Sequence, residues 1–204
     1  MQFIGKNETL IYNFNFKPLK KCSLRTLALV ILWLWIPLSG LHADSIPKYK
    51  RSYFGGWADS DGDCQNTRHE LLQELSTSIM SFTDNTCRVL TGKWLDPYTG
   101  KTFRQSADID IDHMVPLYWA WQHGAHTWSK DKRVRFANDP RNLFAVQKSV
   151  NRAKSASGPL KWLPPNISFR CSYIVRFERI SKIYDLRMSH DEENGFKILK
   201  AQYC

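Results

Sequence analysis

Three aspartates alternate with apolar residues in the segment ADIDIDHMVPL, residues 107–117. Alternate side chains of an extended strand point to opposite faces, so Asp108, Asp110 and Asp112 are expected together on one face. Three carboxylates on one face repel each other unless a positive charge lies beside them. His113 follows the last of them. The spacing therefore requires a compensating positive charge at this strand end, and it places a group that titrates near neutral pH beside that charge.

Two later segments complete a pattern with this one. NDPRNL, residues 138–143, is expected to form a turn that opens a short strand, and VNRAKS, residues 150–155, lies on a short predicted helix. In this order the three segments resemble the HNH endonuclease superfamily, whose ββα-metal unit consists of two strands and a helix. The chain is most similar to small secreted HNH proteins with a DIDH motif, an NRxK helix and a WLPP exit. The likeness runs from DGDCQNTRHELL through GKWLDPYTG to Cys171.

The resemblance implies a role for each matching position. It implies that His113 is the general base that takes a proton from water. It implies that Asp112 and Asn151 are oxygen ligands of one divalent metal ion, Mg²⁺ or Mn²⁺. Asn142 is expected to fix the loop that carries the base through its side-chain hydrogen bonds, and Asp110 to orient a ligand or a water molecule. The metal ion would be the positive charge that the aspartates require.

Side chains near this motif leave two choices open. Arg152 and Lys154 flank the helix-borne ligand and are expected to hold the scissile phosphate, and the alternative is a solvated helix face. Four tryptophans suit either stacking on unpaired bases or packing in the core, and their spacing favours the core: Trp119, Trp121, Trp128 and Trp162.

The elements that must position these residues are mostly helical. Residues 66–80 predict a helix with a capping box at Thr67 and Glu70 and an apolar face reaching Ile79. Residues 87–95 predict a strand, and residues 117–136 helices or irregular structure. Two helices close the chain, of which the second opens with a capping box from Ser189 to Glu192. The predicted fold class is α+β, with a ββα-metal core in a single helix-rich domain that carries disulfides.

The first 43 residues have the pattern of a secretory signal. Basic residues precede the apolar run LALVILWLWIPL, residues 27–38, and small residues follow near Ala43. The run is short for a membrane span, although an uncleaved anchor is the alternative. We therefore predict a cleaved signal over 1–43 and one HNH nuclease domain over 44–204, with its core at 107–158.

The charge and the cysteines of the predicted mature chain, residues 44–204, indicate its partners and its disulfides. The 204-residue chain has 29 Lys and Arg against 19 Asp and Glu; five of the basic residues and one acid lie in residues 1–43, so 24 and 18 remain. This moderate excess favours polyanions as partners. Four cysteines remain as well, an even number with no zinc-ligand spacing. Of three possible pairings, Cys64–Cys87 and Cys171–Cys204 are favoured because each joins parts of one local unit.

These patterns predict a secreted or periplasmic, metal-dependent endonuclease that cleaves DNA, and RNA as a second substrate, as a monomer. Little sequence specificity is expected, because no separate helix-turn-helix or zinc-finger reader is present. Two alternatives remain open: an antibacterial nuclease toxin with an immunity partner, and a non-catalytic nucleic-acid-binding protein on an HNH scaffold.

Overall fold

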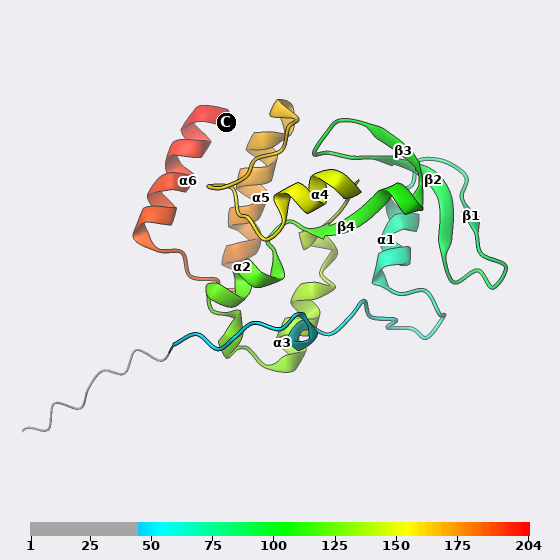
Figure 1. Ribbon diagram of the computed structural model, residues 1–204, viewed down its shortest axis with the longest axis horizontal. Coiled ribbons are helices and arrows are strands. Elements are labelled where there is room, and N and C mark those ends of the chain that lie inside the picture. The colour runs from blue at the N-terminus through cyan, green and yellow to red at the C-terminus, as the bar shows by residue number, and fades with distance from the viewer. Residues whose placement is uncertain (1–44) are drawn as a thin grey trace, which may run out of the picture. The chain divides into compact units, whose positions relative to one another are not determined.

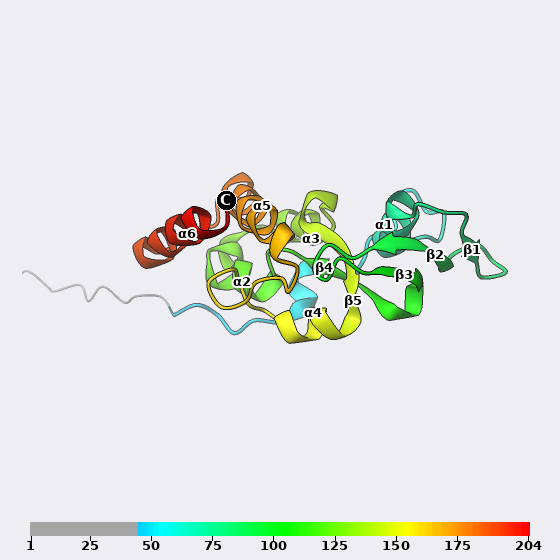
Figure 2. The same cartoon turned by 90° about the horizontal axis from the view of Figure 1, so that it is seen from above.

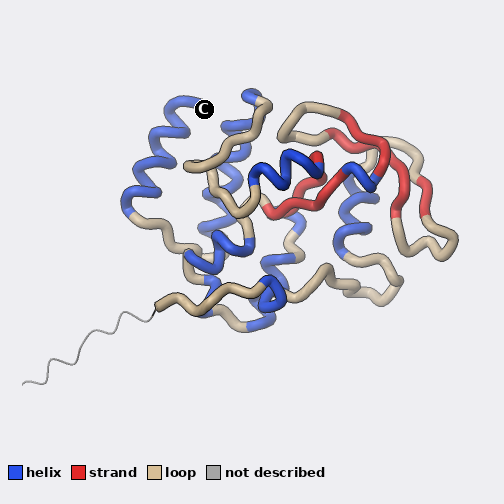
Figure 3. The backbone as a smooth tube through the Cα atoms, in the orientation of Figure 1, coloured by secondary structure: helices blue, strands red, loops and turns tan. Residues whose placement is uncertain are grey.

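The computed structural model describes residues 45–204, and the predicted signal and Cys22 lie outside that range. Ser45–Cys204 forms one compact unit of helices and two small sheets (Figures 1 and 3). The α+β fold class predicted from the sequence is confirmed. Helices α1 to α6 span, in order, Thr67–Leu75, Leu117–Gln122, Lys130–Ala137, Lys148–Lys154, Arg170–Ile183 and His190–Tyr203. Strands β1 to β5 span Ser81–Phe82, Val89–Leu95, Thr102–Gln105, Ile109–His113 and Leu143–Gln147.

The unit that carries the aspartates is an antiparallel strand pair followed by a helix. Strand β4 pairs with β5 so that Asp112 lies opposite Phe144 and His113 opposite Leu143. The alternation of β4 is explained by its two faces. Ile109 and Ile111 are buried in a core with residues of α1, β2 and β5, which leaves Asp110 and Asp112 on the other face. Asp108 does not share that face as predicted, because it lies before the strand on a short 3-10 helix, Ser106–Asp108. Strand β5 runs directly into α4, which lies along this second face.

A second, three-stranded sheet supports one side of the unit. Strands β1, β2 and β3 are antiparallel in that order, and α1 packs against them (Figures 1 and 2). The buried Trp94 of β2 donates a hydrogen bond of 2.7 Å to the carbonyl of Leu72 at the centre of α1. The disulfide Cys64–Cys87 joins the segment before α1 to the start of β2. Helix and sheet are thereby tied into one local unit.

The remaining helices enclose a core rich in aromatic side chains. Helices α2, α3, α5 and α6 contribute to it, and Figures 1 and 2 show α5 and α6 packed side by side. Trp121 is buried there, while Trp119, Trp128 and Trp162 pack against its edge, as their spacing favoured. The disulfide Cys171–Cys204 connects the start of α5 to the end of α6. Both disulfides have the pairing favoured from the sequence. No helix within 45–204 is both long and apolar enough to span a membrane.

The turn before β5 is held by a buried carboxylate. Asp139 accepts hydrogen bonds from the guanidinium of Arg141, at 2.7 to 3.1 Å, and from the hydroxyl of Tyr184, at 2.7 Å. Burial alone would raise the pKa of Asp139, but the bonds from Arg141 and Tyr184 outweigh it, so the pKa lies below its ordinary value. The ionised carboxylate therefore stabilises the turn that leads into β5.

Of the two predicted capping boxes, one is present. At α6, Ser189 and Glu192 exchange the two bonds of a capping box. The capping box predicted at Thr67 and Glu70 is wrong: Thr67 is the first residue of the helix, the N-cap is Asn66, and the hydroxyl of Thr67 donates to the carbonyl of Ala58, 3.0 Å away. The helix is also shorter than predicted. It ends at Leu75, after which the chain bonds to β2, and Ile79 is 97% exposed.

Candidate active site

The ends of β4 and α4 meet around a hollow of about 380 Å³. Asp112 and His113 reach it from β4, and Asn151 reaches it from the middle of α4. The amide of Asn151 donates a hydrogen bond of 3.1 Å to Asp110, which links the helix to the strand. The structure thus brings together four residues that the sequence motifs singled out: Asp110, Asp112, His113 and Asn151.

Asp112 is buried and held by three donor contacts. The Tyr98 hydroxyl donates to its Oδ2 at 2.7 Å, and the Lys154 amine lies 3.0 Å from Oδ1 and 2.9 Å from Oδ2. Burial raises the pKa of Asp112, and the charge of Lys154 opposes this shift. The same burial, with the neighbouring carboxylate, raises the pKa of Tyr98 well above its ordinary value, so the hydroxyl keeps its proton and remains a donor. The carboxylate therefore has a fixed position and orientation.

His113 is held as a neutral imidazole in one tautomer. Its Nε2 lies 2.8 Å from the carbonyl oxygen of Ala137, which can only accept, so Nε2 carries the hydrogen. The indole of Trp57 stacks parallel to the imidazole with ring centroids 5.3 Å apart. Burial lowers the pKa of His113 to about 3. At neutral pH, Nδ1 therefore has an unprotonated lone pair, as a base requires.

Asn142 fixes the segment that follows His113. Its Oδ1 accepts from the backbone N–H of Val115 at 2.8 Å, and its Nδ2 donates to the carbonyl of Val115 at 3.2 Å. Its own carbonyl accepts from the backbone N–H of Met114. The side chain is completely buried. These bonds hold the exit of β4 against the entry of β5 and thereby fix the direction of His113.

The two predicted phosphate-binding residues lie elsewhere. Lys154 is 0% exposed, and its amine is occupied by Asp112 and by the carbonyl of His113 at 2.9 Å. The expectation that it contacts the phosphate does not match this geometry, because α4 turns Lys154 inward onto the buried carboxylate. Arg152 is exposed on α4, but it lines a separate hollow with Asp108 and Lys148. Adjacent positions of an α-helix point in different directions, so Arg152 lies on another side of α4 from Asn151, whereas Lys154, three positions after Asn151, shares its side.

Arg51 is a residue of the site that the sequence did not single out. It lies on a short 3-10 helix, Arg51–Phe54, and lines the hollow of Asp112, His113 and Asn151 as well as a smaller adjoining one beside Trp57. Arg51 is exposed, and none of the ion pairs among residues 45–204 involves it. The only sequence signal was the basic composition of KYKR, residues 48–51.

The oxygen atoms at the hollow fit a divalent cation. Asp112 Oδ1 accepts one bond and keeps a second lone-pair direction, and Asn151 uses its amide nitrogen to bond Asp110, which leaves its Oδ1 for another partner. A carboxylate and an amide oxygen suit Mg²⁺ or Mn²⁺. Within 45–204, a cluster of three acidic ligand groups occurs only at the exposed residues Asp59, Asp61 and Asp63, on the loop before α1.

The antiparallel strand pair ends in Asp-His and leads into a helix with an asparagine, and the family match places the chain in a nuclease-related class of protein. The chain belongs to the family described as GmrSD restriction endonucleases, C-terminal domain, whose pattern matches residues 67–194. It is 38% identical over 149 residues to an "Uncharacterized secreted protein" of Arthroderma benhamiae, covering 72% of each chain. No solved structure matches the chain. Family membership implies a nucleic acid as substrate.

Proposed function

We propose that this protein is an exported, metal-dependent endonuclease that hydrolyses phosphodiester bonds of DNA and has RNA as a second substrate. The observation that carries the proposal is His113, a neutral histidine whose Nε2 is bonded to a carbonyl and whose Nδ1 is unprotonated, beside Asp112 and Asn151 in one hollow. The two disulfides and the name of the secreted relative support export.

The reaction is derived from the residues of the hollow. His113 Nδ1 takes a proton from water as the water oxygen forms a bond to phosphorus, and the bond from phosphorus to the 3′ oxygen breaks. The products are a 5′-phosphate and a 3′-hydroxyl, whose oxygen takes a proton from solvent. The guanidinium of Arg51 can bind the phosphate oxygens through two parallel hydrogen bonds. Trp57 and the carbonyl of Ala137 keep the imidazole in place during the transfer.

Asp112 and Asn151 would hold the divalent cation. When bound, the cation supplies positive charge that stabilises the phosphate and the leaving oxygen in the transition state. Tyr98 and Lys154 keep Asp112 ordered, so that it need not reorganise when the substrate arrives. Lys154 therefore acts through Asp112, not on the substrate itself.

Sequence specificity is expected to be low. The matched family region covers most of the described residues and leaves no further segment of the size of a DNA-reading domain. Attraction between the basic chain and the phosphate backbone would supply most of the affinity, so binding should weaken steeply as salt rises.

The test is a plasmid-nicking assay with the oxidised protein in Mg²⁺, Mn²⁺, Ca²⁺ or EDTA, with linear DNA and RNA as parallel substrates. We expect nicks at many sequences in Mg²⁺ or Mn²⁺ and none in EDTA. His113→Ala should lose activity, whereas His190→Ala, an exposed histidine at the start of α6, should retain it. Cleavage by His113→Ala at the unsubstituted rate, or cleavage in EDTA, would overturn the proposal.

A further inference from the structure

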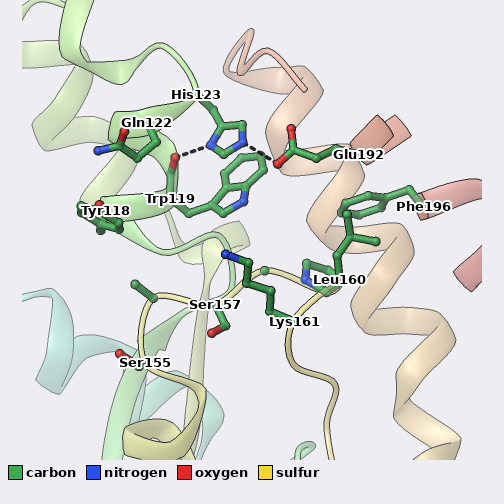
Figure 4. Close-up of a pocket in the computed structure, with 13 residues that line it drawn as sticks. Tyr118, Trp119, Gln122, His123, Ser155, Ser157, Leu160, Lys161, Glu192 and Phe196 are labelled. Atoms are coloured by element: carbon green, nitrogen blue, oxygen red, sulfur yellow. Dashed lines mark hydrogen bonds and ion pairs between the residues drawn. The ribbon is translucent and has the colours of Figure 1, made fainter. Parts of the chain in front are cut away.

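A second hollow, of about 500 Å³, adjoins the one that holds His113. Tyr118, Ser155 and Ala156 line both hollows, so the two are continuous along the surface between α2 and the segment after α4. We call the second hollow the α2–α6 pocket, because residues of these two helices form facing walls (Figure 4). Its size lies within the range of small-molecule sites in proteins.

The walls of the α2–α6 pocket are aromatic and apolar, and one of them is rigid. Trp119 and His123 stack with ring centroids 3.5 Å apart and an angle of 10°. His123 bonds to the carbonyl of Trp119 at 2.6 Å and to Glu192 of α6 at 2.8 Å, which locks the stack in place. Figure 4 shows this stack facing the pocket, with Phe196 on the opposite wall. Such a pocket accepts a flat ring without first having to rearrange.

Polar groups in the pocket are few and available to a ligand. Gln122, Ser157 and Lys161 line it and form no side-chain hydrogen bond with another residue of the range 45–204. In Figure 4 the Lys161 side chain extends toward Trp119. The carboxylate oxygens of Glu192 are already bonded to His123 and Ser189, so they are less available to a ligand. The pocket therefore combines planar apolar walls, an amide, a hydroxyl and one cation.

We propose that the α2–α6 pocket binds an unpaired nucleotide of the cleaved strand, next to the phosphate bound at His113. This proposal rests on the proposed nuclease function. A strand whose phosphate lies between Arg51 and His113 can continue past Tyr118, where the hollow of His113 joins the α2–α6 pocket. Tyr118 is 45% exposed at the junction, where its ring can stack on a base, and Lys161 offers a cation to the next phosphate.

The consequence is a preference for single-stranded or locally opened substrate. A base in a duplex has both faces covered by its neighbours and its edge paired, so it cannot enter a pocket lined by Gln122 and Trp119 without leaving the helix. Extrusion from a duplex requires unstacking and unpairing, which a single strand avoids. The pocket would thus select the strand state of the substrate instead of its sequence.

Steady-state cleavage of a single-stranded oligonucleotide by the oxidised protein tests this. We expect Tyr118→Ala and Lys161→Ala to raise KM about tenfold, as the loss of one stacked base or one phosphate contact implies, with a larger effect on KM than on kcat. Tyr118→Phe should restore the KM, because it keeps the ring. Lys130→Ala, which removes an exposed lysine at the start of α3, is the matched control for charge and should change KM by less than about twofold.

An abasic nucleotide moved along the strand supplies a second readout. We expect KM to rise at one position, at a constant distance from the cut, and the Tyr118→Ala variant to lose that dependence. An equal KM for single strand and duplex, or equal effects at every abasic position, would refute the pocket while leaving the nuclease function intact. If the protein cleaves nothing, the nuclease function fails, and the pocket is tested by measuring how tightly the protein binds the same oligonucleotide in fluorescence anisotropy. Weaker binding by Tyr118→Ala supports the pocket, and unchanged binding refutes it.

Discussion

Replacing Lys154 by methionine should severely destabilise this protein without removing a surface contact. The Lys154 amine is completely buried, with contacts of 2.9 and 3.0 Å to Asp112 and 2.9 Å to the carbonyl of His113. Methionine fills a similar volume but leaves the buried carboxylate with Tyr98 as its remaining donor. Removing one partner of a buried ion pair typically costs about 3–5 kcal/mol, because the other charge remains buried and unpaired.

The double variant Lys154→Met with Asp112→Asn separates the charge effect from the loss of packing. Without the carboxylate there is no unpaired buried charge, so the double variant should be more stable than Lys154→Met alone by about 2 kcal/mol or more. Lys182→Met is the matched control: this lysine is paired with Glu178 on α5 at 3.2 Å, but its side chain is 75% exposed, so its loss should cost less than about 1 kcal/mol.

Urea unfolding of the oxidised protein, followed by tryptophan fluorescence, measures all four free energies under one condition. A loss for Lys154→Met no larger than that for Lys182→Met would refute the reasoning. So would a double variant no more stable than the single one, since the cost would then come from packing. A raised KM with unchanged unfolding free energy would instead return Lys154 to the phosphate-binding role expected from its place beside Asn151.

Three further predictions concern the site and its support. His113→Ala should lower the cleavage rate by about 10²–10⁴-fold with metal affinity nearly unchanged, whereas Asn151→Ala should weaken metal binding and recover part of its rate in excess Mg²⁺ or Mn²⁺. Calorimetry measures the metal affinity and plasmid nicking the rate, and equal rescue of the two variants by excess metal would contradict the division of roles. Arg51→Ala should lower kcat/KM about tenfold or more, while Arg135→Ala, an exposed arginine on α3, should change it little; equal effects would mean that only net charge matters. Asp139→Asn should destabilise the protein at pH 7, and the difference in stability from the unsubstituted protein should shrink as pH falls. A carboxyl whose pKa is lowered by folding contributes stability above its unfolded pKa of about 3.9 and loses it as pH falls through the folded value. Urea midpoints that show the same difference at pH 7 and pH 3 would contradict this.

Much of the site could be predicted because its residues are neighbours in sequence. The alternation in 107–113 separates Asp110 and Asp112 from the isoleucines whatever the rest of the chain does, since strand geometry turns each side chain by the same amount. The position of Asn151 near the aspartates could be predicted as well, because β5 runs directly into α4 and the helix then lies beside β4, the strand that pairs with β5. The roles of these residues remain predictions that the experiments above address.

Other residues could not be assigned from their surroundings in the chain. The pattern at Thr67 and Glu70 suits a capping box, in which the Thr67 hydroxyl would accept a bond, but in the structure the N-cap is Asn66 and the Thr67 hydroxyl donates to the carbonyl of Ala58. Local pattern rules compare only groups within one turn of each other, so they cannot register a competing partner that arrives from outside the helix.

The sequence by itself determined the class of fold, the Asp-His strand end and the helix-borne asparagine, which depend on groups a few residues apart or on the periodicity of helices and strands. It favoured the observed pairing of the cysteines, although the disulfides join residues 23 and 33 positions apart. Only the tertiary structure decided that Lys154 turns inward to Asp112, that Arg51 faces His113 and that the α2–α6 pocket adjoins the site. The physical reason is that burial and charge pairing depend on which distant elements pack together, and those contacts exist only once the whole chain has folded.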